Sequence, residues 1–515
     1  MTTLVAIFAG LLAIIGWPPL AFWPLTLLAY SMLMLISSRT LSFSIATLRG
    51  LTFGLGLHSV GNYWVFLALH YHAGLSSAAS ISSLFFFASY LALFTAIPCG
   101  LWNWIYLSQP IQTSWQKIYK SLSFAALLTL GEWSRTLFFN GYSMLSLGYA
   151  LIDTWLSGYA PILGVYGLSF CGFFLAFLFS DYAYTHFTKA HTHTSMLNGF
   201  IQLLKSLKMP LLFWLTILGI GKLLSYTNWV KPHATSLSYT LIQANISQEN
   251  KFNPLHLQQQ LQTYTSLITQ APADIILTPE TAFPIFFNEM PVNLLSQLQA
   301  FIQTHQSHIF LGIATLSSTS NGYNSLIHLS SQTSTLKEYN KIRLMPFGEY
   351  SPQGFSWFTQ SLDIPLKDQD PGFADQSSFI ISKSQQNYHI APLICHEDSN
   401  GHALRKWLPE ASILIAPSNL GWFQNTSFLD QNIQLLRFRA LELGRPILRA
   451  ANTGFSSHID HHGTIIKQLP IHYRGTLRGE IYPTEGSTPY SYWGDYFILT
   501  ITLLIIINKL LTKPT

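Results

Sequence analysis

The chain has 515 residues, of which 49% are hydrophobic, 14% aromatic and only 10% charged. Soluble proteins carry about 25% charged residues, so the composition excludes an ordinary soluble protein along the whole length. The net charge of +5 is small, and no Lys/Arg run is interleaved with aromatic residues, which argues against a nucleic-acid partner. Two of the three cysteines lie in apolar stretches, so no disulfide framework is predicted.

Acidic residues divide the chain into two parts. The first 230 residues contain only three of them, whereas Asp and Glu become common after Glu249. This contrast predicts a lipid-embedded part followed by a water-soluble one. The expected domains are a transmembrane bundle over residues 1–230, a soluble insert over residues 231–490, and a last membrane helix with its tail over residues 491–515.

Eight apolar segments are candidates for membrane spans. A helix needs about 20 apolar residues to cross the hydrocarbon layer, because its backbone polar groups must be satisfied internally. The first two candidates can form a hairpin at Gly16-Trp17-Pro18-Pro19. The candidates are Leu4–Ile15, Leu20–Ile36, Leu51–Leu69, Ala78–Leu107, Leu122–Phe139, Ile162–Phe179, Leu211–Leu224 and Phe497–Ile507.

The placement of Lys and Arg predicts the orientation, because these residues favour cytoplasmic loops. They follow the second, fourth, sixth and last candidates, as at Arg39, Lys117 and Lys205. The alternate loops, His70–Leu75 and Asn140–Ala160, contain none. Both termini are therefore expected in the cytoplasm of a Gram-negative cell, with the insert in the periplasm and the chain in the inner membrane.

The insert alternates short apolar or β-branched runs with amphipathic stretches, a pattern typical of an α/β layered fold. Gly444 is expected to end one of its helices as a C-cap. Strands are predicted at Tyr239–Gln243, Asp274–Leu277, His308–Ile313, Ser325–Leu329, His389–Ile394, Ile413–Ala416 and Pro446–Ala450. Helices are predicted at Leu255–Ile268, Val292–Thr304, Ser399–Leu408 and Phe428–Leu443.

Three reactive side chains follow predicted strands. Glu280 comes just after Asp274–Leu277, and Cys395 ends His389–Ile394. Lys341 precedes a second carboxylate, Glu349. Catalytic groups favour such positions, because a rigid sheet aims short loops at one point.

These residues resemble the nitrilase, or carbon–nitrogen hydrolase, superfamily, in which Glu, Lys and Cys follow in this chain order. Over the whole chain the sequence is similar to the apolipoprotein N-acyltransferase family, which has the same membrane–insert–membrane layout. The resemblance implies a nitrilase-like αββα sandwich for the insert. It is carried by Pro279-Glu280-Thr281-Ala282-Phe283-Pro284, Lys341, Pro346-Phe347-Gly348-Glu349, Ile394-Cys395-His396-Glu397, Asn419-Leu420-Gly421-Trp422-Phe423, Arg439 to Pro446, and Thr488-Pro489-Tyr490 with Gly494-Asp495.

The resemblance also implies an N-acyltransferase. It would move a fatty acyl chain from a phospholipid to the α-amino group of the N-terminal S-diacylglyceryl cysteine of an apolipoprotein, which completes lipoprotein maturation. Cys395 would be the nucleophile and carry a thioester, in a ping-pong mechanism. Glu280 would serve as base and acid, and Lys341 would favour the thiolate and stabilise the oxyanion. Phospholipid, apolipoprotein and bilayer are the expected partners of a monomer, without cofactor or metal.

Supporting roles follow from the same resemblance. Glu349 and Glu397 would hold Lys341 and the Cys395 loop in place, with His396 beside them. Three residues depart from the family pattern, because Thr278 and Phe252 each replace Trp and His396 replaces Tyr. These departures leave the substrate preference open.

Aromatic residues are candidates for lining a substrate site. Trp422 and Phe423 could equally belong to the core. The segment Ser351–Asp370 is either a packed surface loop or a mobile apolar lid that dips toward the bilayer. The candidates are Phe252, Phe347, Trp357, Phe358, Trp422 and Phe423.

Two other classes of function remain open. A membrane-anchored amidase or nitrilase would use the same triad with water as the second substrate. A non-enzymatic lipid- or partner-binding module would not need Cys395. Glu132 and Asp153 lie near membrane depth, where ionisable groups are functional suspects. Arg135 lies one helical turn from Glu132 and favours a structural pair there.

Overall fold

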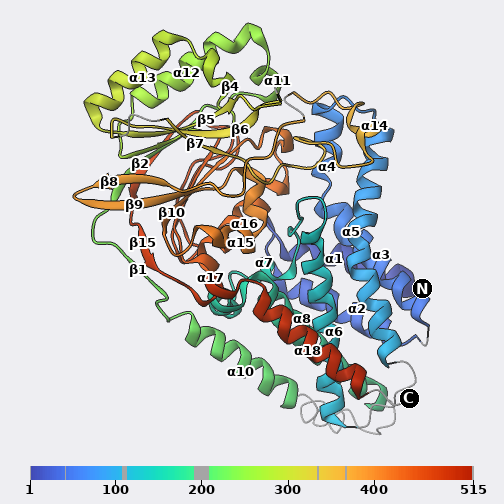
Figure 1. Ribbon diagram of the computed structural model, residues 1–515. Coiled ribbons are helices and arrows are strands. Elements are labelled where there is room, and N and C mark those ends of the chain that lie inside the picture. The colour runs from blue at the N-terminus through green and yellow to red at the C-terminus, as the bar shows by residue number, and fades with distance from the viewer. Residues whose placement is uncertain are drawn as a thin grey trace. The chain divides into compact units, whose positions relative to one another are not determined.

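The computed structural model describes residues 2–40, 42–106, 113–190, 208–319, 321–332, 336–365 and 368–512, without the side chains of residues 181–190. The chain forms two compact units (Figure 1). The first, here called the helical unit, comprises Met1–Tyr63, Ile81–Thr227 and Trp493–Thr515. The second, here called the sandwich unit, comprises Trp64–Ser80 and Asn228–Tyr492.

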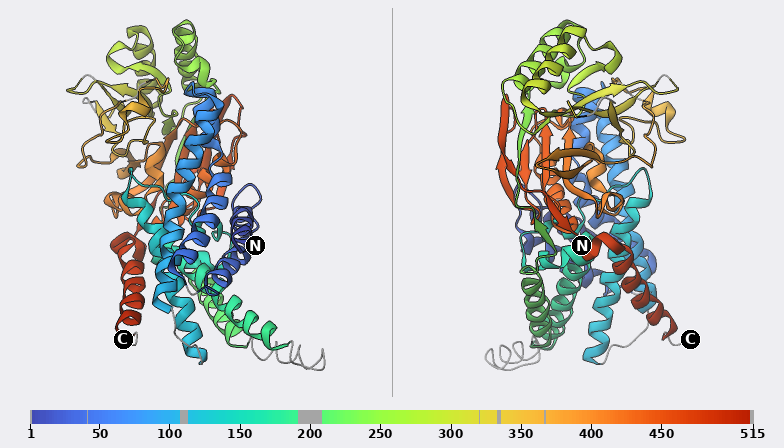
Figure 2. Two further views of the ribbon diagram at one scale, coloured as in Figure 1. Left: turned by 90° about the vertical axis from the view of Figure 1, so that its right-hand side faces the viewer. Right: turned by 60° about the vertical axis from the view of Figure 1, so that its left-hand side comes forward.

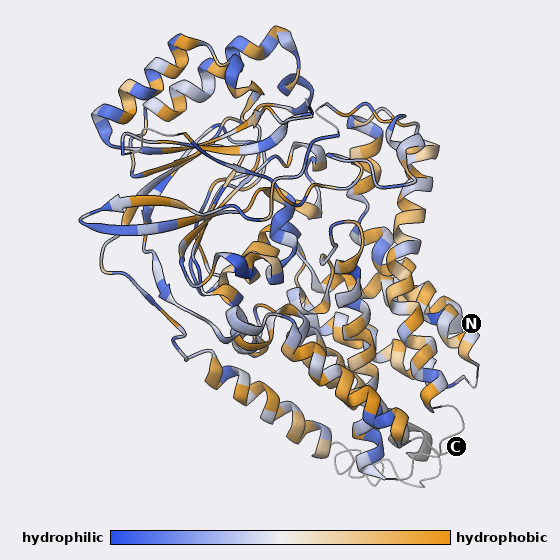
Figure 3. Ribbon diagram, in the orientation of Figure 1, coloured by the Kyte–Doolittle hydropathy of each residue, from blue (hydrophilic) through white to orange (hydrophobic). Residues whose placement is uncertain are grey.

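Long apolar helices build the helical unit, and their ribbons are coloured mainly as hydrophobic in Figure 3. Each of the eight predicted segments overlaps one of them. Among the residues that the structure describes, two helical stretches, Ser77–Tyr106 and Trp155–Ser180, are long and apolar enough to cross a membrane. The eight-span count remains a prediction. The helices are α1 (Thr2–Ala13), α2 (Trp23–Ser37), α3 (Phe43–Gly61), α5 (Ser77–Tyr106), α6 (Ser114–Ser134), α8 (Ala160–Ala190), α10 (Lys208–Leu224) and α18 (Tyr496–Leu511).

The third predicted membrane segment, Leu51–Leu69, begins and ends later in the chain than the helix it overlaps, α3 (Phe43–Gly61). The Ser42 side chain caps α3 by accepting a hydrogen bond from Ile45 N, and α3 ends at Gly61. The apolar sequence continues into α4 (Trp64–Leu67) and the π-helix η2 (Ala68–His72), which belong to the sandwich unit. Hydropathy alone could not separate these stretches, because both bury apolar side chains.

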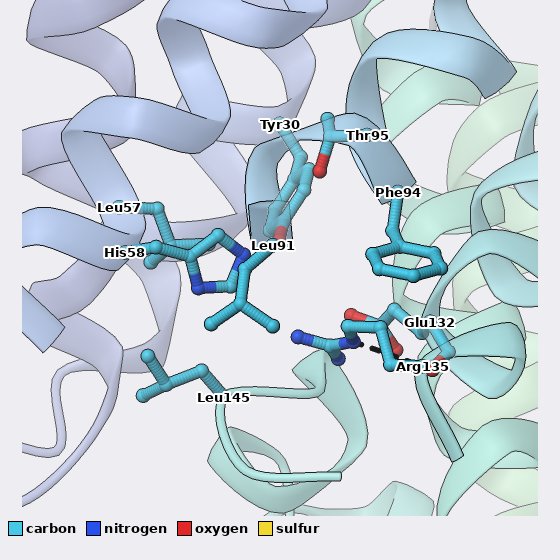
Figure 4. Close-up of a pocket in the computed structure, with 9 residues that line it drawn as sticks. All are labelled: Tyr30, Leu57, His58, Leu91, Phe94, Thr95, Glu132, Arg135 and Leu145. Carbon is cyan, nitrogen blue, oxygen red and sulfur yellow. Dashed lines mark hydrogen bonds between the residues drawn. The ribbon is translucent and has the colours of Figure 1, made fainter. Parts of the chain in front are cut away.

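A small cavity in the helical unit is lined by both Glu132 and Arg135 (Figure 4). Among the described contacts, the Arg135 guanidinium forms no hydrogen bond with the Glu132 carboxylate. It donates to the carbonyl oxygens of Glu132 and Met144 and to the Ser146 hydroxyl. The Glu132 carboxylate accepts from Leu147 N at 2.9 Å. The two side chains thus support the backbone around Met144–Leu147, which agrees with the predicted structural pair, although no hydrogen bond joins their charged groups in the part of the chain that the structure describes.

Two sheets form the centre of the sandwich unit. Their strand orders are β14-β2-β3-β5-β6-β7, with β4 beside β5, and β13-β12-β11-β10-β9-β8. The first sheet contains β2 (Leu237–Gln243), β3 (Ile275–Leu277), β4 (Phe283–Phe286), β5 (His308–Thr315), β6 (Tyr323–Leu329), β7 (Lys337–Asn340) and β14 (Gly475–Ile481). The second contains β8 (Phe379–Lys383), β9 (Gln386–Pro392), β10 (Ala411–Ser418), β11 (Ile447–Ala451), β12 (Ser457–Ile459) and β13 (Ile465–Gln468).

Alternation along the strands creates two cores. Ile275 and Leu277 of β3 point into the core between the sheets, whereas Ile276 packs in a second core with α12 (Leu257–Thr269) and α13 (Val292–His305). Such alternation is the consequence of a two-residue period in a strand. Helix α16 (Ser427–Leu443) packs against the other sheet, so the layers run helix, sheet, sheet, helix (Figures 1 and 2). This is the expected αββα sandwich.

Most predicted elements of the insert occur within a few residues of their expected bounds. Gly444 takes φ +66° and caps α16 as predicted. The predicted helix Ser399–Leu408 is helical from Gly401 to Trp407, but it is not one continuous helix. Its residues form short pieces, because η7 (Cys395–Ser399) is followed by α15 (Gly401–Leu404) and η8 (Arg405–Trp407). The Cβ that any other residue would add at Gly401 would lie 1.9 Å from Glu442 Oε1 and 2.2 Å from Arg439 Nη1, so a side chain there would force this buried ion pair to shift.

Gly312 of β5 supplies a test of how tightly the first sheet is packed. A Cβ at this position would lie 2.0 Å from the Pro279 carbonyl oxygen. We expect Gly312→Ala to destabilise the protein by about 1–3 kcal/mol, since overpacking forces backbone shifts. The melting temperature of the full chain in detergent measures this loss.

The control is Gly219→Ala in α10, where nothing lies within 4 Å of the added Cβ. That change should be neutral or stabilise the helix by roughly 0.5–1 kcal/mol. Equal melting temperatures for the two variants would contradict the expected close contact between β5 and Pro279.

Candidate active site

A buried ammonium group joins two carboxylates at the ends of the strands. Lys341 follows β7, and its Nζ lies 2.9 Å from Glu280 Oε1 and 2.8 Å from Glu349 Oε1. Its side chain is 1% exposed, against 6% for Glu280 and 15% for Glu349. Lys341 N also donates to Asn324 O of β6 at 2.8 Å, which fixes the backbone at this point. The structure thus brings together the predicted acid and the predicted lysine.

Glu280 is held on both carboxylate oxygens. Asn324 Nδ2 donates to Glu280 Oε1 at 2.8 Å and to Glu349 Oε1 at 2.9 Å. Asn419 N, just after β10, donates to Glu280 Oε2 at 2.8 Å. Burial acts to raise the pKa of Glu280, but the Lys341 charge and these donors outweigh burial and leave its pKa below the ordinary value.

Lys341 is correspondingly held as a cation. Burial acts to lower the pKa of Lys341, but Glu280, Glu349 and Cys395 together raise it well above the ordinary value. A buried lysine keeps its charge only where opposite charges compensate for lost hydration. The site therefore holds a fixed ammonium group beside an ionised carboxylate.

Cys395 begins the short helix η7, where its backbone takes φ +48°. This left-handed conformation is unfavourable for a residue with a side chain, and such strain concentrates at functional sites. Burial raises the pKa of the Cys395 thiol, the Glu280 charge raises it further, and the Lys341 charge opposes them. Cys395 therefore rests as a protonated thiol within electrostatic reach of both groups.

Glu397 ties the Cys395 loop to the end of β7. Its Oε1 accepts from the Tyr339 hydroxyl at 2.7 Å and from Ile342 N at 2.9 Å. Its Oε2 accepts from Ile394 N at 2.7 Å, next to the cysteine. Glu349 contacts Lys341, and Glu397 bridges the lysine and cysteine loops; their supporting roles stay a prediction. His396 lies half-buried on the same short helix.

A second buried ionic cluster lies behind the cysteine loop. Asp398 Oδ2 accepts from Arg449 Nη1 at 3.3 Å and from Asn432 Nδ2 at 3.1 Å. Arg449 Nη2 donates to Asn432 Oδ1 at 2.6 Å. Burial raises the pKa of Asp398 to about 6, against the opposing effect of Arg449. This cluster fixes η7 on β11 and α16.

The aromatic candidates fall into two groups. Phe423 is 9% exposed and packs with Phe428 and Trp64, at ring-centroid distances of 3.9 and 5.0 Å. It therefore belongs to an aromatic core. Trp422 is half-buried, and its ring forms a T-shaped contact with the His72 ring at a centroid distance of 5.8 Å. Phe252 is half-buried, with Lys251 Nζ 5.7 Å from its ring centroid.

The second aromatic group comprises Phe347 and residues of the predicted lid Ser351–Asp370. Phe347 packs edge-on against Phe355 and Phe358 at 5.4 and 5.9 Å. Trp357 is 71% exposed and contacts only the edge of Phe358 among the ring contacts described. The lid segment includes residues 366 and 367, which lie outside the described residues.

Sequence reasoning missed several residues of the site. Asn324 lies inside β6, and no motif sets it apart from other strand residues. Asn419 acts through its backbone N–H, although its stretch carried the family resemblance. Lys251 of α11 (Gln248–Lys251) is 2% exposed and reaches the Glu280 turn. Within the residues that the structure describes, no three His, Cys, Asp or Glu side chains are grouped to hold a metal ion.

Two family models match the chain. Residues 9–178 match the apolipoprotein N-acyltransferase N-terminal domain, and residues 240–490 match carbon–nitrogen hydrolase. An amidase from Nesterenkonia sp., in complex with acrylamide, is a structural neighbour at 16% identity. It covers 49% of this chain and 92% of its own, with a TM-score of 0.36.

Curated relatives match nearly the full length. An apolipoprotein N-acyltransferase of Nitrosomonas europaea is 32% identical over 511 residues, covering 98% of this chain and 96% of its own. One of Ralstonia nicotianae is 30% identical over 509 residues, covering 98% and 92%. Because the similarity spans both the helical and the hydrolase-like parts, the chain belongs to the apolipoprotein N-acyltransferase family.

Proposed function

We propose that this N-acyltransferase forms a thioester on Cys395 and passes the acyl group to the α-amino group of a diacylated apolipoprotein. Its relatives carry out N-acylation of apolipoproteins, as their name states. The observation that carries the proposal is the buried Lys341 ammonium, which joins Glu280 and Glu349 within electrostatic reach of Cys395.

In the first half-reaction, a phospholipid ester is the acyl donor. The Glu280 carboxylate accepts the proton of the Cys395 thiol as the sulfur attacks the ester carbonyl carbon. The tetrahedral intermediate places negative charge on the former carbonyl oxygen, and Lys341 stabilises it. The ester C–O bond then breaks, and Glu280 returns its proton to the leaving alkoxide. The products are a lysophospholipid and an acyl-Cys395 thioester.

In the second half-reaction, the lipoprotein amine replaces the alcohol. Glu280 accepts a proton from the incoming amine, which attacks the thioester carbonyl. The C–S bond breaks, and the sulfur recovers the proton from Glu280. An amide is far less reactive than a thioester, so this step runs downhill.

The aromatic groups suggest where the acyl chain lies. Phe347 follows Lys341 in the chain and packs with the lid residues Phe355 and Phe358. Trp357 is exposed and could enter a lipid surface, where indole rings favour the interfacial region. We assign the lid Ser351–Asp370 to guiding acyl chains, with Trp422 and Phe252 as further lining candidates.

The proposed setting is the inner membrane, with eight spans, cytoplasmic termini and a periplasmic sandwich unit. The Lys and Arg pattern supports this orientation. The match of residues 9–178 to the family's N-terminal domain favours the transferase over a simply anchored amidase.

Acyl-enzyme formation tests the mechanism. The purified full chain in detergent is incubated with a phospholipid that bears a labelled acyl chain, without an acceptor. We expect a hydroxylamine-sensitive label on Cys395 that persists until a diacylated lipopeptide is added. Cys395→Ala should abolish the label, whereas Cys99→Ala and Cys171→Ala should keep it.

The outcome also separates the rival functions. A label that decays rapidly without the lipopeptide would favour the hydrolase. A label of equal intensity in Cys395→Ala would overturn the proposed nucleophile. The absence of any label from the wild type would favour the binding-module alternative.

The base is tested by Glu280→Gln, which keeps the shape of the side chain but cannot accept a proton. We expect the rate of thioester formation to fall about 100-fold or more, in line with the usual effect of general base catalysis. The control is Glu410→Gln, an exposed position that should retain the wild-type rate. A wild-type rate in Glu280→Gln would exclude this carboxylate as the base.

The orientation is tested by labelling from outside. Ser384→Cys, in the exposed β8–β9 turn, should react with a membrane-impermeant maleimide in intact spheroplasts. Ser114→Cys, at the start of α6, should react only after lysis, since Lys117 and Lys120 favour the cytoplasmic side. The reverse pattern would contradict the proposed topology.

A further inference from the structure

The chain contains a second buried lysine next to the Glu280 turn. Lys251 Nζ donates to the Glu280 carbonyl oxygen at 3.1 Å and to Thr281 Oγ1 at 2.7 Å. Its side chain is 2% exposed. A lysine is rarely buried without a specific role, because its ammonium group loses its hydration.

The two hydrogen bonds of Lys251 act on a strained peptide. Thr281 takes φ +44°, which is unfavourable for a β-branched residue. Such a conformation persists only where surrounding contacts determine it. Lys251 holds the peptide oxygen before Thr281 and the hydroxyl of Thr281, so it fixes the direction in which the Glu280 side chain leaves the backbone.

The short helix α11 carries Lys251 and touches the site at a second point. Gln248 Oε1 accepts from Asn419 Nδ2 at 3.1 Å, and Asn419 N in turn donates to Glu280 Oε2. The preceding loop is bonded to the end of β11, because Asn245 N donates to Asn452 O at 3.0 Å. Helix α11 is therefore anchored to both sheets. It contacts the backbone of Glu280 through Lys251, and it supports the Glu280 carboxylate through Gln248 and Asn419.

The charges of the site give Lys251 a second effect. Glu280 and Glu349 present two carboxylates, and Lys341 supplies one ammonium group in contact with both. The attack step adds a developing thiolate at Cys395. Lys251 contacts the backbone of Glu280 directly, and its charge interacts with the negative charges of Glu280 and of an ionised Cys395, so a protonated Lys251 opposes the build-up of negative charge in this step.

We propose that Lys251 is a positioning residue of the acyltransferase site, which fixes the Glu280–Thr281 turn and favours ionisation of Cys395 with its charge. The inference rests on the proposed roles of Glu280 and Cys395. It differs from the role of Lys341, because Lys251 bonds to the backbone of the base and not to its carboxylate.

The charge of Lys251 changes near neutral pH. Burial lowers the pKa of Lys251 to about 7, against the opposing charges of Glu280 and Cys395. Below this pH the amine is protonated and favours the thiolate. Above it the amine is neutral, and the electrostatic effect disappears while the hydrogen bonds to the turn remain possible.

The test measures the alkylation rate of Cys395 by iodoacetamide from pH 5.5 to 9, followed by mass spectrometry of the Cys395 peptide in the full chain. We expect Lys251→Met to react about tenfold more slowly below pH 7, because a nearby opposite charge shifts a pKa by about one unit or more. The deficit should shrink above pH 7, where the wild-type amine loses its charge. Lys251→Arg should restore the rate at low pH.

Two further variants separate charge from folding. Thr281→Val keeps the shape of Thr281 but removes the hydroxyl acceptor, and it should slow thioester formation without changing the pH at which the alkylation slope breaks. Lys383→Met removes a half-exposed lysine paired with Asp274 and should match the wild type at every pH. Melting temperatures of all variants report on folding.

The results distinguish this inference from the proposed mechanism. If Lys251→Met and Lys251→Arg show the same deficit at every pH, Lys251 has only a structural role and the inference is wrong. Wild-type behaviour of Lys251→Met would also overturn it, while the Cys395 thioester would stand. If the label in the wild type does not depend on Cys395, the proposed mechanism itself fails.

Discussion

The site depends on one ammonium group that is removed from water together with two carboxylates. Burying these charges costs several kcal/mol per ion, and only close contacts compensate for the loss. Lys341 makes such contacts with Glu280 and Glu349, and Asn324 bridges the same two carboxylates from the side. The low dielectric that makes the cluster costly also strengthens its effect on Cys395.

The backbone around this cluster is as unusual as its charges. Cys395, Thr281 and Phe347 all take left-handed conformations, at φ +48°, +44° and +64°. Each lies on a short loop that leaves a sheet, and each loop is held by a buried side chain or a strand neighbour. The sheets therefore supply both the rigidity and the hydrogen bonds that keep these strained peptides in place.

Periodicity was sufficient to predict an α/β layered fold for the insert, because most of its strands and long helices are buried on one face or on both. The αββα arrangement was implied by the family resemblance and not by the periodicity. The strands β4, β7, β8, β12, β13 and β14 of the two sheets were not predicted. In β7, the polar residues Lys337 and Glu338 hide the alternation. The segment after the cysteine, Ser399–Leu408, was predicted as one continuous helix, whereas it forms short helical pieces. The four- and five-residue turns between Cys395 and Leu404 are imposed by Gly401 and by the buried contacts of Glu397 and Asp398, which no local pattern reveals.

The reactive residues were easier to predict than their surroundings. Glu280, Lys341 and Cys395 stand in recognisable stretches at strand ends, whereas Lys251 and Asn324 act through contacts between segments far apart in the chain. The predicted span Leu51–Leu69 ran past the end of α3 for a related reason, since the contacts of the apolar residues after Gly61 are made with distant segments. Trp64 is as apolar as any membrane residue, yet its partners are Phe423 and Phe428 of the sandwich unit.

This placement of Trp64–Ser80 constrains biosynthesis. The sandwich unit is discontinuous in the chain, and its aromatic core is completed only when the ribosome has translated Phe428. Trp64 must therefore remain available throughout the insertion of the helices that follow it. A recombinant fragment cut at Asn228 and Tyr492 would leave Phe423 and Phe428 without the indole that covers them, and would aggregate unless polar residues replaced that surface.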